Sequence, residues 1–413
     1  FGHDEVGAER GPAPDDLAAC VGSVRRHTPA GSYRLILIDD ASPDPAIAAQ
    51  FAAWAADGDP SLLLLANDEN RGFSHTVNRG LAVDADRDVV LLNSDTIVTA
   101  GWLAKLRRCA ASDATIGTVT PMSNNSTVTS FPRFGLDNDL AALPPLDVVA
   151  RAIEEAAVPT YPDLPTAIGF CMLIRREVIR RIGLFDAQTF GRGYGEDNDY
   201  SMRARKAGFR NVLCDDTFIA HAGSRSFGDE RHALSRVNVQ RLHQRHPEYG
   251  AILGRFLAAN PVLAIGAAAA LRLDALARAD RPGILHVQHD DPGGGTRTHV
   301  DELIGASAVQ FRHRVLRVGP DGWRLQTGDA QDPGSGTFRP AADETWTDVL
   351  RDLCGFLRVD LVHVHHLLGA RAELVAALGA AEIPYGITLH DHYLACPTNT
   401  LVDERGEYCH ATT

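Results

Sequence analysis

The chain has 413 residues, of which 45% are hydrophobic and 23% are charged, and its formal net charge is −13. This length predicts two or three domains, and the composition is typical of a globular protein. The acidic balance argues against nucleic acid as the main partner, since phosphate binding requires a basic face. Seven scattered cysteines, without a CxxC pair, indicate reduced thiols.

Hydropathy gives little indication of a membrane protein. No signal-peptide pattern stands out, and the most apolar run, Pro261 to Leu271, is shorter than a bilayer-spanning helix requires. We therefore expect a cytoplasmic protein. Peripheral contact with the inner face of a membrane is a second expectation, based on the apolar stretch 261–280.

Predicted strands and helices alternate along the first hundred residues. The predicted strands are 33–38, 62–66 and 89–92, and the predicted helices are 15–27, 45–56 and a third from about residue 73. This alternation predicts a doubly wound α/β layer with a parallel sheet, in which ligands bind beyond the carboxyl ends of the strands. Asp39, Asp40, Asn93 and Asp95 follow two of these strands. Asp95 is either a ligand for a divalent cation that bridges a diphosphate or an ordinary acidic turn residue.

The stretch Gly191 to His221 holds the densest group of candidate catalytic side chains. Glu196, Asp197 and Asp199 lie within four positions at the start of a predicted helix, and a predicted strand, 211–214, leads to His221. Such a cluster can hold a metal and a general base together. The alternative is an acidic first turn that favours the helix dipole, beside an ordinary surface histidine.

A second α/β unit is predicted to begin at Gly283, after the Ala- and Leu-rich helical stretch 261–280. Its predicted strands are 284–288, 314–318, 361–364 and 385–389, and residues 327–343 read as a loop. The glycines 293–295 allow a tight turn into a helix near Thr296. Five histidines lie at the ends of the later strands, as strand-end residues, a coincidental cluster or a metal site: His363, His365, His366, His390 and His392.

Five motifs, in order, resemble family 2 glycosyltransferases with the GT-A fold. They are IDDASPD, ENRGFSHTVNRG, LLNSDTIV, GFCMLIRREVIRRIGLFD and GYGEDNDYSMRARKAGF, followed by a later histidine. The resemblance covers about Pro14 to His246. It implies transfer of a sugar from a dTDP-, UDP- or GDP-sugar donor to an acceptor hydroxyl, with inversion and with Mn²⁺ or Mg²⁺ as cofactor.

The resemblance also implies a role for each matching position. The donor would bind to Asp39, Asp40, Arg71, Gly72, Asn78, Asn93 and Asp95. The metal would bind to Asp95, Asn93 and His221, with Asn93 replacing the first acid of the motif usually written DxD. Asp197 would be the general base, with Glu196 as a second catalytic candidate. Gly193, Tyr194 and Asp199 would lie on the acceptor side, Asp199 with helix-start structure as its alternative. The family opens with a strand of the type VxVVxPxYN, and no such pattern precedes Asp15.

The second half resembles the N-terminal half of a family 4 glycosyltransferase with the GT-B fold, over about Pro282 to Thr413. The resemblance implies that the loop 293–295, His365 and His390 line the acceptor side of a cleft, and that the donor-binding half of that fold is absent. We therefore expect a GT-A domain (1–258), a helical linker (259–281) and a partial, Rossmann-like GT-B half (282–413).

The leading hypothesis is an inverting transferase that adds a sugar to a growing bacterial surface polysaccharide. Resemblance of two motifs to rhamnosyltransferases favours rhamnose or another deoxyhexose. The acceptor would be a glycan or a lipid-linked glycan, and other polysaccharide-assembly enzymes are expected partners. One alternative is a non-catalytic scaffold. Another is a nucleotidyltransferase, which would require a glycine-rich basic phosphate loop that the sequence does not show.

Overall fold

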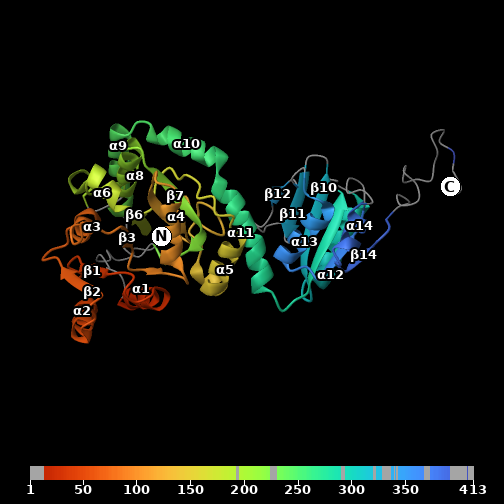
Figure 1. Ribbon diagram of the computed structural model, residues 1–413, viewed down its shortest axis with the longest axis horizontal. Coiled ribbons are helices and arrows are strands. Elements are labelled where there is room, and N and C mark those ends of the chain that lie inside the picture. Colours follow the sequence, from red (N-terminus) through yellow and green to blue (C-terminus); the bar gives the residue numbers. More distant parts are fainter. Residues whose placement is uncertain are drawn as a thin grey trace, which may run out of the picture. The chain divides into compact units, whose positions relative to one another are not determined.

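The computed structural model describes residues 14–191, 195–223, 230–289, 294–319, 322–327, 336–338, 343–366 and 373–390, together with Pro340 and Glu407. The chain divides into two compact units, Phe1–Gly266 and Ala267–Thr413, here called unit 1 and unit 2 (Figure 1). The division falls within one helix, α11 (Pro261–Ala277). The three-segment organisation expected from the sequence stays a prediction.

The elements of unit 1 alternate largely as the sequence predicts. The strands are β1 (Leu35–Asp39), β2 (Leu62–Ala66), β3 (Val89–Leu92), β4 (Thr96–Ile97), β5 (Ile116–Met122), β6 (Cys171–Ile174), β7 (Arg210–Phe218) and β8 (Ala220–His221). The helices up to the central stretch are α1 (Pro14–His27), α2 (Pro45–Asp57), α3 (Phe73–Leu81), α4 (Trp102–Ser112), α5 (Leu146–Ala156), α6 (Arg176–Ile182), α7 (Ala187–Phe190) and α8 (Glu196–Lys206). They are followed by α9 (Glu230–Arg245), α10 (Tyr249–Ala259) and α11.

Within the described ranges, the strands of unit 1 form three hydrogen-bonded groups. β1 pairs with β2 in parallel, β4 pairs with β8, and the remaining strands form a sheet in the order β3-β6-β5-β7. The predicted parallel pairing is confirmed for β1 and β2, but it is wrong for β3, whose neighbour β6 runs antiparallel to β3 and to β5. For β6 to run parallel to β5, the connecting segment would have to return the chain to the end of the sheet where β5 begins. The long segment between β5 and β6 instead leaves the chain at the end where β5 finishes, so β6 runs antiparallel to it.

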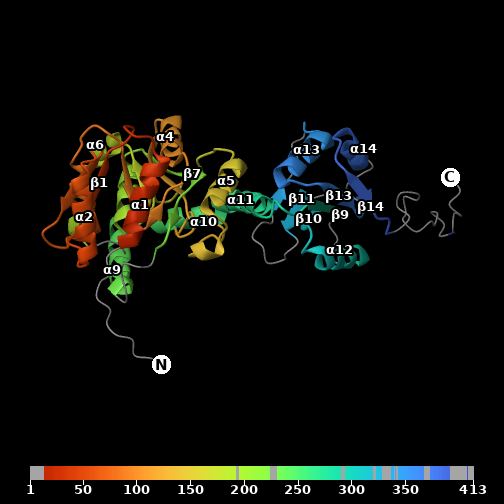
Figure 2. The same cartoon turned by 90° about the horizontal axis from the view of Figure 1, so that it is seen from below.

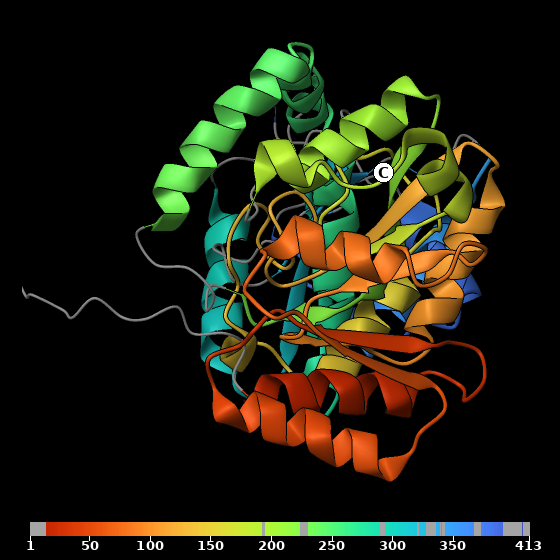
Figure 3. The ribbon, with the colours of Figure 1, turned by 90° about the vertical axis from the view of Figure 1, so that its left-hand side faces the viewer.

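Helices cover both faces of the β1–β2 pair. Alternate residues of a strand point to opposite faces. Leu35 and Leu37 of β1 therefore pack against buried residues of α1 and α2, among them Val21 and Trp54. Figure 3 shows α1 and α2 side by side below β1 and β2. On the other face, a Cβ built on Gly80 of α3 would lie 3.2 Å from the Cδ1 atom of Ile38. The packing holds the last turn of α3 against β1 near the carboxyl end of the strand.

The helical stretch Tyr249–Ala277, which contains α10 and α11, is long and apolar enough to cross a membrane by length and composition. Its most apolar window is 44% buried within the protein. Core helices of globular proteins share these properties, so the observation is weak evidence for a membrane span.

Unit 2 contains one mixed sheet in the order β12-β11-β10-β9-β13-β14. The strands are β9 (Gly283–His289), β10 (Arg312–Gly319), β11 (Gly322–Thr327), β12 (Gly336–Phe338), β13 (Leu361–Val364) and β14 (Tyr385–Ile387). The helices are α12 (Gly295–Ser307), α13 (Trp346–Leu357) and α14 (Glu373–Ala380). The four strands β10, β9, β13 and β14 run parallel to one another. β11 and β12 extend the sheet beyond β10 as antiparallel strands. The short strand β12 lies in the segment predicted to be only a loop.

Helices cover both faces of the unit 2 sheet. One face is apolar: Leu285, Val287 and Leu316 pack against residues of α13 and α14. The other face carries Val315, which packs against Val300 of α12. Figure 2 shows α12 on one side of the sheet and α13 and α14 on the other.

Candidate active site

A two-residue antiparallel ladder joins two distant segments of unit 1. Thr96 of β4 pairs with His221 of β8. The pairing places a carboxylate oxygen of Asp95 3.5 Å from the Nε2 atom of His221. The side-chain amide of Asn93 lies 3.4 Å from the same Nε2 atom, and Gly223 donates its backbone N–H to Asp95 at 2.9 Å. The three predicted metal ligands therefore lie close together.

The tautomer of His221 follows from its second ring nitrogen. The Nδ1 atom lies 2.8 Å from the carbonyl oxygen of Asn125, which can only accept a hydrogen bond. Nδ1 therefore carries the proton, and the neutral ring presents the Nε2 lone pair to Asp95 and Asn93. Metal-binding histidines are commonly held by such a bond from the other nitrogen. The ring also stacks on Phe170, with 5.1 Å between centroids.

Charge and burial oppose each other at this pair. Burial lowers the pKa of His221, but the hydrogen bond and charge of Asp95 outweigh it, so that this pKa is raised. Burial would likewise raise the pKa of Asp95, but His221 and the Gly223 N–H lower it overall. A carboxylate, an imidazole nitrogen and an amide oxygen form a suitable donor set for a divalent cation. A half-turn of the Asn93 side-chain amide exchanges its nitrogen and oxygen, so that the oxygen faces the position of a cation.

The carboxylate of Asp40 holds the loop that leads into α3. It accepts the backbone N–H groups of Arg71 and Gly72 at 2.9 and 2.8 Å, and the side-chain amide of Asn67 at 2.6 Å. Burial would raise its pKa, but these hydrogen bonds lower it overall. Asp40 thus positions Arg71, whose side chain is exposed. Asp39 accepts the Ser42 N–H at 3.0 Å and shapes the turn after β1.

Asp197 and Glu196 begin helix α8. Asp197 accepts the N–H of Asn198 at 2.8 Å and that of Gly169 at 3.4 Å. Burial raises its pKa, which strengthens the carboxylate as a base. Glu196 is 8% exposed, and among the described residues its Oε2 atom has no hydrogen-bond partner. Burial, together with the charge of Asp197, raises the pKa of Glu196 as well.

Gly169 and Phe170 connect Asp197 to the group formed by Asn93, Asp95 and His221. Gly169 donates to Asp197, while the ring of the next residue, Phe170, stacks on His221. The carbonyl oxygen of Phe170 also accepts the N–H of Asn93 at 2.9 Å. The sequence motif GFCM belonged to the resemblance, but no role was assigned to these two residues. Their part in the site became visible only through these contacts.

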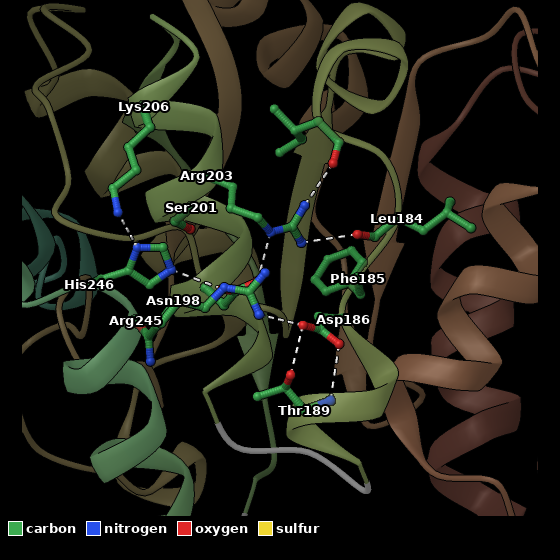
Figure 4. A network of polar contacts seen from close by, with 12 residues as sticks. Leu184, Phe185, Asp186, Thr189, Asn198, Ser201, Arg203, Lys206, Arg245 and His246 are labelled. Carbon is green, nitrogen blue, oxygen red and sulfur yellow. Dashed lines mark hydrogen bonds and ion pairs between the residues drawn. The ribbon is translucent and has the colours of Figure 1, made fainter.

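Asp199 is a structural residue. Its carboxylate is fully buried, accepts a hydrogen bond from the Nε atom of Arg203 at 2.7 Å and lies 2.9 Å from His246 Nε2. It also forms an ion pair with the Nε atom of Arg245 at 3.1 Å. Lys206 lies 2.8 Å from the other nitrogen of His246. Figure 4 shows this network between α8, α9 and the residues that follow. Of the two roles considered for Asp199, these contacts favour helix-start structure, and the acceptor-side role stays a prediction.

Asn78 is also engaged by the protein itself. Its side-chain amide donates to the carbonyl oxygen of Phe185 at 2.8 Å and accepts the Phe185 N–H at 2.9 Å. Both ends of the amide are therefore occupied, which favours a role in holding α3 against the segment before α7. Gly193 and Tyr194 lie outside the described residues, so their acceptor-side roles stay predictions.

Comparisons with known proteins identify the class of unit 1. Residues 14–239 match the family described as "Glycosyltransferase like family 2". The chain belongs to this family, whose members are nucleotide-sugar-dependent glycosyltransferases. The predicted α/β domain with a GT-A-like fold is thereby confirmed for this region, and a second α/β sheet follows it.

The relatives found among curated proteins are uncharacterized proteins of Mycobacterium tuberculosis and Mycobacterium bovis. Each is 29% identical over 164 residues, covering 38% of this chain and 56% of the relative. The match thus spans little more than half the length of these relatives.

Two solved structures show limited likeness. One is GalNAc-T7 with UDP, GalNAc and Mn²⁺ (16% identity, TM-score 0.39, covering 50% of this chain and 40% of that one). The other is the mannosyltransferase PcManGT of Pyrobaculum calidifontis with GDP-Man and Mn²⁺ (19% identity, TM-score 0.41, covering 72% and 77%).

Proposed function

We propose that unit 1 transfers a sugar from a nucleotide diphosphate donor to an acceptor hydroxyl, with inversion at the anomeric carbon. The observation that carries the proposal is the contact of Gly169 with Asp197 beside the contact of Phe170 with His221. Through these neighbouring residues, a carboxylate base lies next to a group of candidate metal ligands.

In this reaction Asp197 accepts the proton of the acceptor hydroxyl while the oxygen forms the new bond to the anomeric carbon. The bond from that carbon to the diphosphate oxygen breaks, and the nucleoside diphosphate leaves with the electron pair. The raised pKa of Asp197 makes the carboxylate a stronger base for this transfer. A divalent metal bound by Asp95, His221 and Asn93 would supply charge neutralisation for the leaving diphosphate. Arg71, held by Asp40, adds a second positive charge.

The identity of the substrates is the finer part of the proposal. A deoxyhexose donor such as dTDP-rhamnose, and a glycan or lipid-linked acceptor of a surface polysaccharide, follow from the sequence motifs. The proposal also places the protein in the cytoplasm, with peripheral membrane contact. It treats unit 2 as the N-terminal half of a GT-B-type transferase.

A panel of nucleotide sugars tests the proposal, with binding and turnover measured in Mn²⁺ and in Mg²⁺. Asp197→Asn is expected to abolish turnover while donor binding persists, because the amide cannot take the proton. The matched control is Asp86→Asn, which changes a carboxylate that is 89% exposed. Turnover retained in Asp197→Asn would exclude this base. If the wild type neither binds a donor nor shows a metal-dependent thermal shift, the scaffold alternative is favoured instead.

A further inference from the structure

Unit 2 contains a cluster of histidines under helix α12, separate from the site proposed above. His286 in β9 lies directly opposite Val315 of β10 and His363 of β13. Residues opposite each other on neighbouring strands share a face. Val315 packs against α12, so the histidines lie on the same face as this helix. His313 and His365, two positions along from these residues, also belong to this face.

A continuous chain of hydrogen bonds runs through three of these histidines and Ser307, the last residue of α12. His365 Nε2 lies 2.9 Å from His286 Nδ1, and His286 Nε2 lies 2.9 Å from His313 Nδ1. His313 Nε2 lies 3.1 Å from Ser307 Oγ, which donates to the carbonyl oxygen of Leu303 at 2.6 Å.

The last acceptor in this chain determines every proton position before it. A carbonyl oxygen can only accept, so Ser307 donates to Leu303 and accepts the Nε2–H of His313. The Nδ1 atom of His313 then accepts from His286, and the Nδ1 atom of His286 accepts from the Nε2–H of His365. The Nδ1 atom of His365 is therefore left with a lone pair.

The Nδ1 lone pair of His365 faces two further histidines. His390 Nε2 lies 3.5 Å from it, and His299 of α12 contacts both rings, with centroids 5.6 Å from His365 and 4.9 Å from His390. One nitrogen from each of the three residues lies within 4.8 Å of the others. Tetrahedral Zn²⁺ with Zn–N distances of about 2.0–2.1 Å places its nitrogens about 3.3 Å apart. His365 and His390 nearly meet this spacing, and the half-buried ring of His299 can close the remainder by rotating.

We propose that His299, His365 and His390 form a binding site for Zn²⁺ or a similar divalent transition metal. Three imidazole nitrogens favour such a cation over Mg²⁺ or Ca²⁺, which prefer oxygen ligands, and three protein ligands leave a fourth position open. His286, His313 and Ser307 hold the ligand His365 in the required tautomer, as outer-shell partners do.

A second set, His286, His363 and His365, also brings three nitrogens within 4.8 Å. In that set, both nitrogens of His286 already form hydrogen bonds, and the Nε2 atom of His363 lies 2.8 Å from Thr388 Oγ1. Binding there would break these bonds. The first set would replace the 3.5 Å contact between His390 Nε2 and His365 Nδ1 but leaves the chain from His365 to Ser307 intact, so we assign the metal to it.

Zn²⁺ titration of the full chain, by calorimetry and by competition with a chromophoric chelator, tests this assignment. The background variant His221→Ala removes the imidazole of unit 1, so that its site does not contribute. We expect one Zn²⁺ per chain, and affinity at least about 100-fold weaker in His299→Ala or His390→Ala, beyond the ~10–100-fold typical of outer-shell losses. The control His75→Ala, an exposed histidine of α3, should bind as the background does.

Ser307→Ala provides a second readout that keeps all three ligands. It removes the anchor of the hydrogen-bond chain and should weaken Zn²⁺ binding by about tenfold. Co²⁺ in place of Zn²⁺ should give the visible absorption of a tetrahedral site, lost in His299→Ala. The proposal is overturned if no Zn²⁺ binds, if His299→Ala and His75→Ala bind alike, or if His363→Ala abolishes binding while His299→Ala does not. None of these outcomes depends on turnover by unit 1.

Discussion

Replacing Asp199 by alanine tests whether its buried carboxylate holds α8 in place. The change leaves Arg203, Arg245 and His246 without their common acceptor. Breaking a buried ion pair costs about 3–5 kcal/mol. The lower end applies here, because Arg203 still donates to the carbonyl oxygens of Ile182 and Leu184 at 2.9 and 3.0 Å. We therefore expect a loss of about 3 kcal/mol in the free energy of unfolding of unit 1.

Scanning calorimetry measures this loss. For a unit of this size, about 3 kcal/mol corresponds to a fall in Tm of about 6–12 °C. The matched control is Glu155→Ala, which breaks an exposed ion pair with Arg151 one helical turn away and should cost about 0.5 kcal/mol or less. If Asp199→Ala and Glu155→Ala lower the Tm equally, the buried network does not stabilise the unit, and a direct role of Asp199 toward the acceptor becomes open again.

Three further predictions concern the candidate site. Since burial raises the pKa of Glu196 in the folded state, stability should fall as pH rises above the ordinary value of about 4.3, until Glu196 itself ionises. The Tm of Glu196→Gln should depend less on pH over this range, and superimposable profiles would contradict the burial argument. Because the pKa of His221 is raised in the folded state, its pairing with Asp95 stabilises unit 1 fully below pH about 6.5. This stabilisation is lost as the pH rises through the pKa of His221 in the folded state. In metal-free buffer, His221→Gln should therefore lower the Tm more at pH 6 than at pH 8.5, whereas an equal effect would argue against the ion pair. Asn93→Asp adds a charge to the ligand set and should tighten Mn²⁺ binding about tenfold by calorimetry; unchanged affinity would show that residue 93 is not a ligand.

The sequence was most informative where local periodicity decides the structure. The apolar runs that became β2 and β3 were predicted to the residue, because short apolar runs with polar ends leave few alternatives. The direction of β6 was not predictable, since strand direction depends on how the chain returns to the sheet and not on the strand itself.

The same distinction applies to the candidate sites. Asp197 and Asp199 lie two positions apart in α8. Successive residues of an α-helix are rotated by about 100°, so these two side chains point to different faces of the helix. Local sequence indicates an acidic helix start but does not say which acid faces the core. In unit 2, the HVHH pattern indicated His363 and His365, whereas His286, His299 and His313 joined the cluster only through strand register and the packing of α12.

The ladder between β4 and β8 also has consequences for the folding of unit 1. Asn93 and His221 are 128 positions apart in the chain, so their approach is a contact of very high sequence separation. Such contacts form late, because the intervening chain must be ordered before the two segments can meet. A ligand that bridges them cannot bind a partly folded chain. We therefore expect such a ligand to protect unit 1 as a whole against unfolding, and slow-exchanging amides far from the ligand to report its binding.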